Sequence, residues 1–218
     1  MRPVRLLIFD LDGTLVNTLE DITASVNFTL SRLGRPLLPM DTVRQYVGDG
    51  ITTLLTRSLG NRVELLDDAV GIYTAHHSRN LIVRSRLYPG VRGTLEHFRG
   101  IPLAVISNKA DDLVKPLLDR LGIAGYFREV LGAEAGLPLK PAPDAVLRVV
   151  SDLGAPKDRT VIVGDGATDI LAGKAAGVIT CAVTYGFRSG DALRAAGPDL
   201  VIQEFSELTR IFQPDPSS

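Results

Sequence analysis

Residues 5–14 read RLLIFDLDGT, an apolar run that passes directly into two carboxylates one residue apart, Asp10 and Asp12. A short apolar run of this kind is typical of a buried strand, and Gly13 permits a sharp bend just after it. In open α/β sheets, ligands bind at the carboxyl edge of the strands, where both aspartates would lie. Two adjacent anions repel unless a cation lies between them, and hard oxygen ligands suit Mg²⁺. The alternative interpretation is an ordinary turn after a strand, since Asp and Gly are common turn residues.

The composition is that of an ordinary globular protein. Of 218 residues, 45% are hydrophobic and 22% are charged, and the formal net charge is -1. This small charge gives no overall field that would attract nucleic acid or an anionic membrane, so we expect neither as a partner. The single cysteine, Cys181, excludes an intrachain disulfide and lies in an apolar run typical of a buried position. No apolar stretch approaches the ~18 residues of a transmembrane helix, and the N-terminus leads directly into a strand, so we expect a cytoplasmic protein.

Strand and helix patterns alternate over most of the chain. Apolar or β-branched runs predict strands over 4–9, 102–106, 160–163, 178–183 and 200–202. Helical spacing of apolar residues predicts helices over 91–99, 111–121, 144–153, 169–176 and 205–212. The alternation predicts an α/β fold with a doubly wound parallel sheet, that is, a Rossmann-like core.

Residues 16–86 interrupt this alternation and contain no clear strand pattern. Apolar residues recur at helical spacing in three groups, over 19–33, 43–59 and 64–81. We therefore expect an all-helical segment, called the cap below, inserted after the first strand. The predicted division is an α/β core of residues 1–15 and 87–218 and a helical cap of residues 16–86, with hinges at 16–18 and 87–90.

Three further groups of polar residues follow predicted strands or lie in loops. Ser107 and Asn108 come directly after the strand at 102–106, where they would hold a phosphate oxygen or cap a helix. Lys140 lies in a proline-rich loop, as a charge that neutralises a phosphate or as a solvated surface lysine. Asp165 lies just beyond the predicted strand at 160–163, and Asp169 lies near the start of the next helix. An acidic residue at a helix start either belongs to a functional site or caps the helix.

In chain order these groups are Asp-x-Asp-Gly-Thr at 10–14, Ser-Asn at 107–108, Lys-Pro at 140–141 and Gly-Asp-x-x-x-Asp at 164–169. With a helical insertion after the first element, the pattern resembles the haloacid dehalogenase-like hydrolase superfamily over essentially the whole chain. Segments 46–50, 87–91 and 183–186 are also similar to phosphoglycolate phosphatases. The resemblance implies hydrolysis of a small phosphorylated metabolite, 2-phosphoglycolate, and we expect a monomer or a homodimer.

Other functions remain open at this point. Pyrophosphatases, broad sugar-phosphate phosphatases and β-phosphoglucomutase-like enzymes of the same superfamily share several of these features. Alternatives from other classes are a non-catalytic scaffold and a phospho-aspartate signalling domain. The intact acidic and lysine positions argue against a scaffold, and Ser107 stands where a signalling domain would need a phospho-acceptor aspartate.

The resemblance also implies roles for individual residues. Asp10 would be the nucleophile that forms an aspartyl phosphate, and Asp12 would be the general acid and then the general base. Mg²⁺ would be bound by Asp10, the backbone carbonyl of Asp12 and Asp165, with Asp169 supporting the metal shell. Phosphate- and substrate-binding groups are expected at Thr14, Ser107, Asn108 and Lys140 and, in the cap, at Gly48 and Gly50.

Within the cap, Gly48 and Gly50 would allow a loop to approach closely and to offer backbone N–H groups to a small carboxylate. Arg44 and Arg57 are cationic candidates for the same task. The sequence does not distinguish between these groups.

Two positions depart from the pattern of many relatives. Gly166 replaces a serine after the Gly-Asp pair, and Asn17 replaces an aspartate in the first hinge. Neither residue has a direct chemical role in the implied mechanism, so we expect activity to survive. His76 and His77 in the cap are expected to be packing or surface residues, because no spaced metal-binding partners accompany them.

Overall fold

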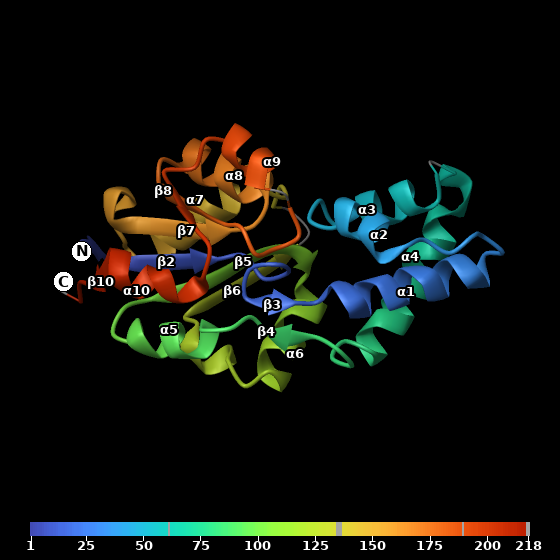
Figure 1. Ribbon diagram of the computed structural model, residues 1–218, viewed down its shortest axis with the longest axis horizontal. Coiled ribbons are helices and arrows are strands. Elements are labelled where there is room, and N and C mark those ends of the chain that lie inside the picture. The colour runs from blue at the N-terminus through green and yellow to red at the C-terminus, as the bar shows by residue number, and fades with distance from the viewer. Residues whose placement is uncertain (61, 134–136, 189, 217–218) are drawn as a thin grey trace.

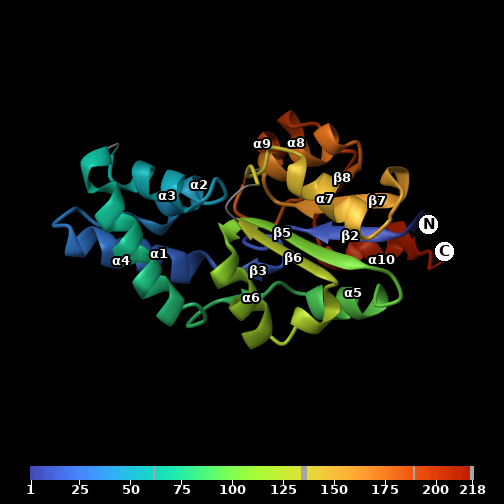
Figure 2. The ribbon, with the colours of Figure 1, turned by 180° about the vertical axis from the view of Figure 1, so that it is seen from behind.

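The computed structural model describes residues 1–60, 62–133, 137–188 and 190–216, which form two parts of unequal size (Figures 1 and 2). The larger part is a sheet with helices on both faces. The smaller part is a group of helices from residues 19–79 that lies beside one end of the sheet. Both chain termini lie at the end of the molecule far from these helices (Figure 1).

The strands of the main sheet are β2 (Leu6–Phe9), β5 (Leu103–Ala110), β6 (Glu129–Ala133), β7 (Thr160–Gly164), β8 (Ile179–Val183) and β9 (Leu200–Ile202). Over the described residues they form a six-stranded parallel sheet in the order β6-β5-β2-β7-β8-β9. Leu7 of β2 pairs with Leu103 on one side and with Val161 on the other. The chain therefore builds outward in one direction from β2 and then in the other, as in doubly wound folds. The predicted fold class is confirmed.

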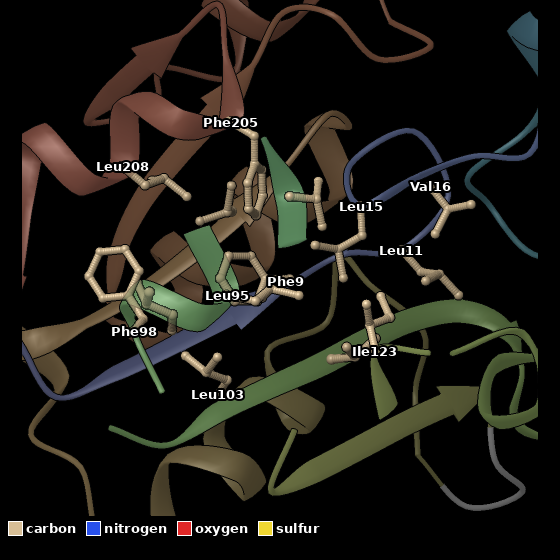
Figure 3. Packing of buried hydrophobic residues seen from close by; sticks show 14 of the residues in the cluster. Phe9, Leu11, Leu15, Val16, Leu95, Phe98, Leu103, Ile123, Phe205 and Leu208 are labelled. Atoms are coloured by element: carbon tan, nitrogen blue, oxygen red, sulfur yellow. The ribbon is translucent and has the colours of Figure 1, made fainter. Parts of the chain in front are cut away.

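Helices cover both faces of the sheet because successive residues of a buried strand point to opposite faces. Leu7 and Phe9 pack in one apolar cluster with α5 (Val91–His97), α6 (Asp111–Arg120) and α10 (Leu208–Ile211). Figure 3 shows Phe9 among Leu95, Phe98 and Phe205 in this cluster. Leu6 and Ile8 pack on the other face with α7 (Asp144–Asp152) and α8 (Ala167–Ala176). Each fully buried large apolar side chain contributes about 1.5–3 kcal/mol, so both faces hold β2 firmly in position.

The helical part is connected to the sheet by two short strands that pair antiparallel, β3 (Val16–Asn17) and β4 (Arg86–Leu87). Between them lie α1 (Leu19–Arg32), α2 (Met40–Tyr46), α3 (Ile51–Ser58), the 3-10 turn η1 (Val63–Leu65) and α4 (Leu66–Arg79). These helices bury an apolar cluster that includes Ile22, Leu55 and Tyr73, and Phe187, which follows β8 in the core, also belongs to it. The expected helical segment is therefore present, and its status as a separate domain with the stated boundaries stays a prediction.

A buried carboxylate joins the first and last segments of the cap. Asp21, in the first turn of α1, is 3% exposed. It accepts hydrogen bonds from the backbone N–H groups of Val83 and Arg84 at 3.0 Å and of Ser85 at 2.8 Å. The Ser85 hydroxyl donates to it as well, at 2.7 Å. The segment that returns to β4 is thus held directly against the start of α1.

The structure differs from the sequence-based prediction at the margins of the sheet. The strand predicted over 4–9 is two strands, because β1 (Arg2–Val4) pairs with β10 (Phe212–Pro214) in a separate sheet. The strand β6 was not predicted; it lies at the sheet edge and is mostly half-buried, so it lacks a strong apolar pattern. The helix predicted over 205–212 is a 3-10 turn, η4 (Phe205–Glu207), followed by α10.

The remaining short elements are η2 (Ala124–Tyr126), η3 (Lys157–Arg159) and α9 (Gly190–Ala195). No helix within the described ranges combines the length and the apolar character that crossing a bilayer requires.

Candidate active site

The predicted site residues meet where the strand order reverses. Asp10 directly follows β2, Ser107 and Asn108 lie within β5, and Asp165 directly follows β7. Because β5 and β7 flank β2 on either side, their carboxyl ends bring these side chains together at one edge of the sheet. This is the position at which open α/β sheets bind ligands.

Three aspartates form a buried acidic cluster at this edge. Asp10, Asp165 and Asp169 each offer a carboxylate oxygen, and these oxygens all lie within 4.8 Å of one another. Their side chains approach so closely because glycines surround them. A Cβ atom on Gly13 would lie 2.3 Å from an Asp165 oxygen, and one on Gly164 would lie 2.3 Å from Asp169. The glycines therefore leave the space that the acidic cluster fills.

Lys140 is the buried cation of the cluster. Its ammonium group donates to Asp10 Oδ1 at 2.8 Å, to Asp169 Oδ1 at 2.6 Å and to the backbone carbonyl of Ile106 at 2.7 Å. Asn108 fixes the loop that carries it, accepting from the Lys140 N–H and donating to the Lys140 carbonyl, both at 2.9 Å. The interpretation of Lys140 as a solvated surface lysine is therefore wrong, since it is 4% exposed.

The pKa values of these groups reflect burial first and the neighbouring charges second. Burial raises the pKa of Asp10 to about 7; the ammonium of Lys140 opposes that shift, and the Asp169 carboxylate adds to it. Burial, and then the neighbouring Asp10, also hold the pKa of Asp165 well above its ordinary range. Burial alone would lower the pKa of Lys140, but the adjacent carboxylates outweigh it and the pKa is raised.

These residues fit a divalent cation. Three carboxylates against one ammonium group leave two uncompensated negative charges when all four groups are ionised. Buried charges of one sign are unfavourable without a compensating partner, and carboxylate oxygens are the donors that Mg²⁺ prefers. Asp10, Asp165 and Asp169 would hold the ion.

Thr14 faces the acidic cluster. Its hydroxyl lies 3.3 Å from Asp165 Oδ1 and 3.5 Å from Asp10 Oδ2, and its backbone carbonyl accepts from the Tyr185 hydroxyl at 2.8 Å. Its observed role is thus to support the carboxylates, while direct contact with a phosphate stays a prediction.

Asp169 is fixed from its own helix. The N–H of Gly166 donates to Asp169 Oδ2 at 3.0 Å, so that one carboxylate oxygen caps the start of α8 while the other meets Lys140. The interpretation of Asp169 as a helix cap is therefore correct, and its role in a metal site stays a prediction. The missing serine side chain at position 166 leaves this backbone contact intact.

Asp12 lies apart from the acidic cluster and has its own partners. Lys109 Nζ lies 3.2 Å from Asp12 Oδ2 and 3.4 Å from Asp12 Oδ1, and the Thr18 hydroxyl donates to Oδ1 at 2.7 Å. The sequence analysis did not identify Lys109 or Thr18. Lys109 was detectable in principle, because it directly follows Ser107 and Asn108 in the sequence.

A cavity of about 290 Å³ lies between this edge of the sheet and the cap. Asp10, Asp12 and Lys140 line it from the core, together with Ser107 and Asn108. The cap contributes a largely apolar wall and a glycine-containing loop; these lining residues are Ile22, Val47, Gly48, Asp49, Gly50, Ile51, Leu54 and Tyr73. Gly48 and Gly50 thus lie at the cavity, as the sequence suggested, and their contact with a substrate stays a prediction.

Two core side chains hold the cap loop at the cavity. Asn108 Nδ2 donates to the Gly48 carbonyl at 3.0 Å. Arg188, which follows β8, donates to the backbone carbonyls of Gln45 (2.6 Å) and Val47. Sequence reasoning missed Arg188, because nothing in the sequence indicates that a residue beyond β8 reaches α2.

The cationic candidates of the cap do not line the described cavity. Arg57 forms an ion pair with Asp49 at 2.6 Å, and Arg44 lies 3.4 Å from Asp41. His77 Nδ1 lies 3.0 Å from the Ser25 hydroxyl inside the cap, which agrees with its expected packing role.

Comparisons with known proteins agree with this geometry. The model of the haloacid dehalogenase-like hydrolase family matches residues 7–183. A phosphoglycolate phosphatase of Pseudomonas fluorescens is 39% identical over 215 residues, covering 94% of this chain and 78% of the relative. A phosphoglycolate phosphatase of Aquifex aeolicus is 34% identical over 210 residues, covering 95% of this chain and 96% of the relative. Among solved structures, a predicted phosphoglycolate phosphatase from Haemophilus somnus has a TM-score of 0.88 at 30% identity, covering 95% and 97% of the two chains.

Proposed function

This chain belongs to the haloacid dehalogenase-like hydrolase family, and we propose that it is a Mg²⁺-dependent phosphatase that hydrolyses 2-phosphoglycolate through an aspartyl phosphate on Asp10. Membership makes it an enzyme of the hydrolase type, and the relatives described above are named phosphatases. The metal, the covalent route and the substrate are the parts that we propose.

The buried acidic cluster beside the cavity is the observation that carries the proposal. Asp10 lines the cavity, is 8% exposed, and meets the Lys140 ammonium at 2.8 Å. A carboxylate in contact with a fixed ammonium group, facing a cavity, is placed to attack an electrophile that the same ammonium group holds. A phosphate monoester is such an electrophile, because its oxygens carry the negative charge that a cation would bind.

The residues then divide the reaction between them. The Asp10 carboxylate attacks phosphorus in line with the ester oxygen and forms an acyl phosphate. Asp12 donates a proton to the departing alkoxide and later accepts one from the water that hydrolyses the acyl phosphate. Lys140 stabilises charge on the phosphoryl oxygens. When bound, Mg²⁺ would supply further positive charge that screens the nucleophile from the phosphate.

The choice of 2-phosphoglycolate rests on the names of relatives at 34% and 39% identity. The cavity supports a small substrate, and the cap loop at Gly48 and Gly50 lies against it. We further propose that the substrate is the principal partner, and that the protein acts in the cytoplasm as a monomer or a homodimer.

The test is phosphate release from 2-phosphoglycolate beside pyrophosphate, β-glucose 1-phosphate and other sugar phosphates, with Mg²⁺ and with chelator. Asp10→Asn provides the blank. We expect a kcat/KM for 2-phosphoglycolate at least ~100-fold above the others, which corresponds to about 2.7 kcal/mol of discrimination. Similar rates for all substrates would retain the phosphatase and reject the specific substrate. Failure to release phosphate from any of them would contradict the proposal.

A further inference from the structure

We propose that Lys109 is a specificity-determining residue that binds a carboxylate carried next to the scissile ester bond of the substrate. The inference rests on the proposed function, because it assumes that Asp12 serves the leaving-group oxygen. It adds the group that would distinguish an acidic phosphate ester from a neutral one.

The first step is the position of the Lys109 ammonium. Its side chain is 7% exposed, lines the cavity and contacts the Asp12 carboxylate at 3.2 and 3.4 Å. Both distances are at or beyond the long end of the range for hydrogen bonds. The ammonium group has three donors, so that it can keep contact with Asp12 and still donate to a second anion.

The second step is the geometry of the substrate class. To protonate the leaving group, Asp12 has to reach the ester oxygen of the bound phosphate ester. In a 2-phospho acid the carboxylate carbon is only two covalent bonds from that oxygen. A cation in contact with Asp12 therefore lies beside the place where this carboxylate has to be.

The third step is the engagement of the other cations of the cavity. Lys140 contacts Asp10 and Asp169, and in the proposed function it binds the phosphoryl group. Arg188 lines the cavity, but its guanidinium donates to the carbonyls of Gln45 and Val47 in the cap. Among the described residues that line the cavity, Lys109 is thus the cation whose partner belongs to the leaving-group side of the reaction.

A matched pair of ligands separates this role from a purely structural one. 2-Phosphoglycolate and ethyl phosphate have the same phosphate, ester oxygen and adjacent carbon, and they differ in the carboxylate. Dissociation constants for both would be measured by calorimetry with Mg²⁺ in Asp10→Asn, in which turnover is blocked. The same measurements would be made after adding Lys109→Met, which keeps most of the side-chain length and removes the charge.

We expect Lys109→Met to weaken binding of 2-phosphoglycolate at least 10-fold more than binding of ethyl phosphate, as a lost charge-assisted hydrogen bond would do. In the otherwise native enzyme, the same substitution should lower kcat/KM for 2-phosphoglycolate mainly through KM. Lys109→Arg keeps the charge and should recover part of the preference. Lys157→Met is the control for loss of a positive charge, because Lys157 is exposed and precedes the N-terminal end of β7, away from the site.

Equal losses of affinity for 2-phosphoglycolate and ethyl phosphate would overturn the inference, because Lys109 would then act only by supporting Asp12. If Lys109→Met does not fold, Lys109→Gln, which keeps a donor for Asp12, undergoes the same comparison. The unsubstituted enzyme is measured first. If it does not hydrolyse 2-phosphoglycolate with Mg²⁺, the proposed function fails; if it does and the losses are equal, only the role of Lys109 fails.

Discussion

Removal of the Asp21 carboxylate should destabilise the protein strongly, although Asp21 has no part in the proposed chemistry. The side chain accepts four groups from the segment 83–85: three backbone N–H groups and the Ser85 hydroxyl. Ser85 is buried, so its N–H and hydroxyl would lose their acceptor without gaining water. Val83 and Arg84 are exposed, so their two N–H groups can be rehydrated.

The magnitude follows from this difference in exposure. A buried donor left unsatisfied costs about 1–3 kcal/mol, whereas a rehydrated one costs about 0.5 kcal/mol. Two buried donors and two rehydrated ones suggest that Asp21→Ala lowers the free energy of unfolding by about 3–7 kcal/mol. Asp21→Asn, which keeps one acceptor oxygen, should lower it by less. Equilibrium unfolding in urea, followed by circular dichroism, measures both values.

Glu20→Ala is the matched control. Glu20 precedes Asp21 in the same helical turn, but its ion pair with Arg86 at 3.4 Å is exposed. Such a pair contributes about 0–1 kcal/mol. If Asp21→Ala were no more than about 1 kcal/mol less stable than Glu20→Ala, the argument that Asp21 holds the two ends of the cap together would be refuted.

Three further predictions concern the site. Burial raises the pKa of Asp10 to about 7 from an ordinary value of 3.8, so the metal-free protein loses stability from this group as the pH rises from about 4 to 7. The increase in melting temperature on adding Mg²⁺ should therefore be larger at pH 8 than at pH 5. An equal increase at the two pH values would argue against a cation at this cluster. Gly13→Ala places a Cβ 2.3 Å from an Asp165 oxygen, at a φ of +95°. Mg²⁺-dependent thermal stabilisation and phosphatase activity should therefore both be lost. Retention of either would show that the close approach of residue 13 to the Asp165 carboxylate is unnecessary. Arg188→Met removes two hydrogen bonds to cap carbonyls. It should raise KM about 5- to 10-fold, as expected for the loss of ~1 kcal/mol of binding free energy or slightly more. An unchanged KM would exclude a role for Arg188 in placing the cap loop.

The sequence predicts the centre of this molecule better than its margins. Asp10 and Asp165 were identified because each follows an apolar run long enough to be a buried strand, and parallel strands bring their carboxyl ends together. The strand β6 escaped prediction because it is a half-buried edge strand that contains Glu129 and Gly132. A sequence pattern reports burial, and an edge strand has little of it.

The same reasoning explains which site residues were missed. Lys140 belongs to a motif, so its position in the sequence was informative, whereas its contacts with both Asp10 and Asp169 required the fold. The pairing of Lys109 with Asp12 joins residues 97 positions apart, and that of Arg188 with Gln45 joins residues 143 positions apart. No periodicity or spacing within one sequence encodes such pairs: the first arises from the pairing of β5 with β2, and the second from the way the cap lies against the core.

The central claim is that Asp10 becomes phosphorylated, and mapping the phosphoryl group tests it most directly. Asp12→Asn should slow hydrolysis of the acyl phosphate, because it removes the base that activates water. This variant would be mixed with p-nitrophenyl phosphate, whose good leaving group needs little protonation, then quenched in acid, digested and examined by mass spectrometry. We predict a phosphoryl adduct on the peptide that contains Asp10, and its absence when Asp10→Asn is added. Phosphate release by the variant without any adduct, or an adduct on a different residue, would contradict the account.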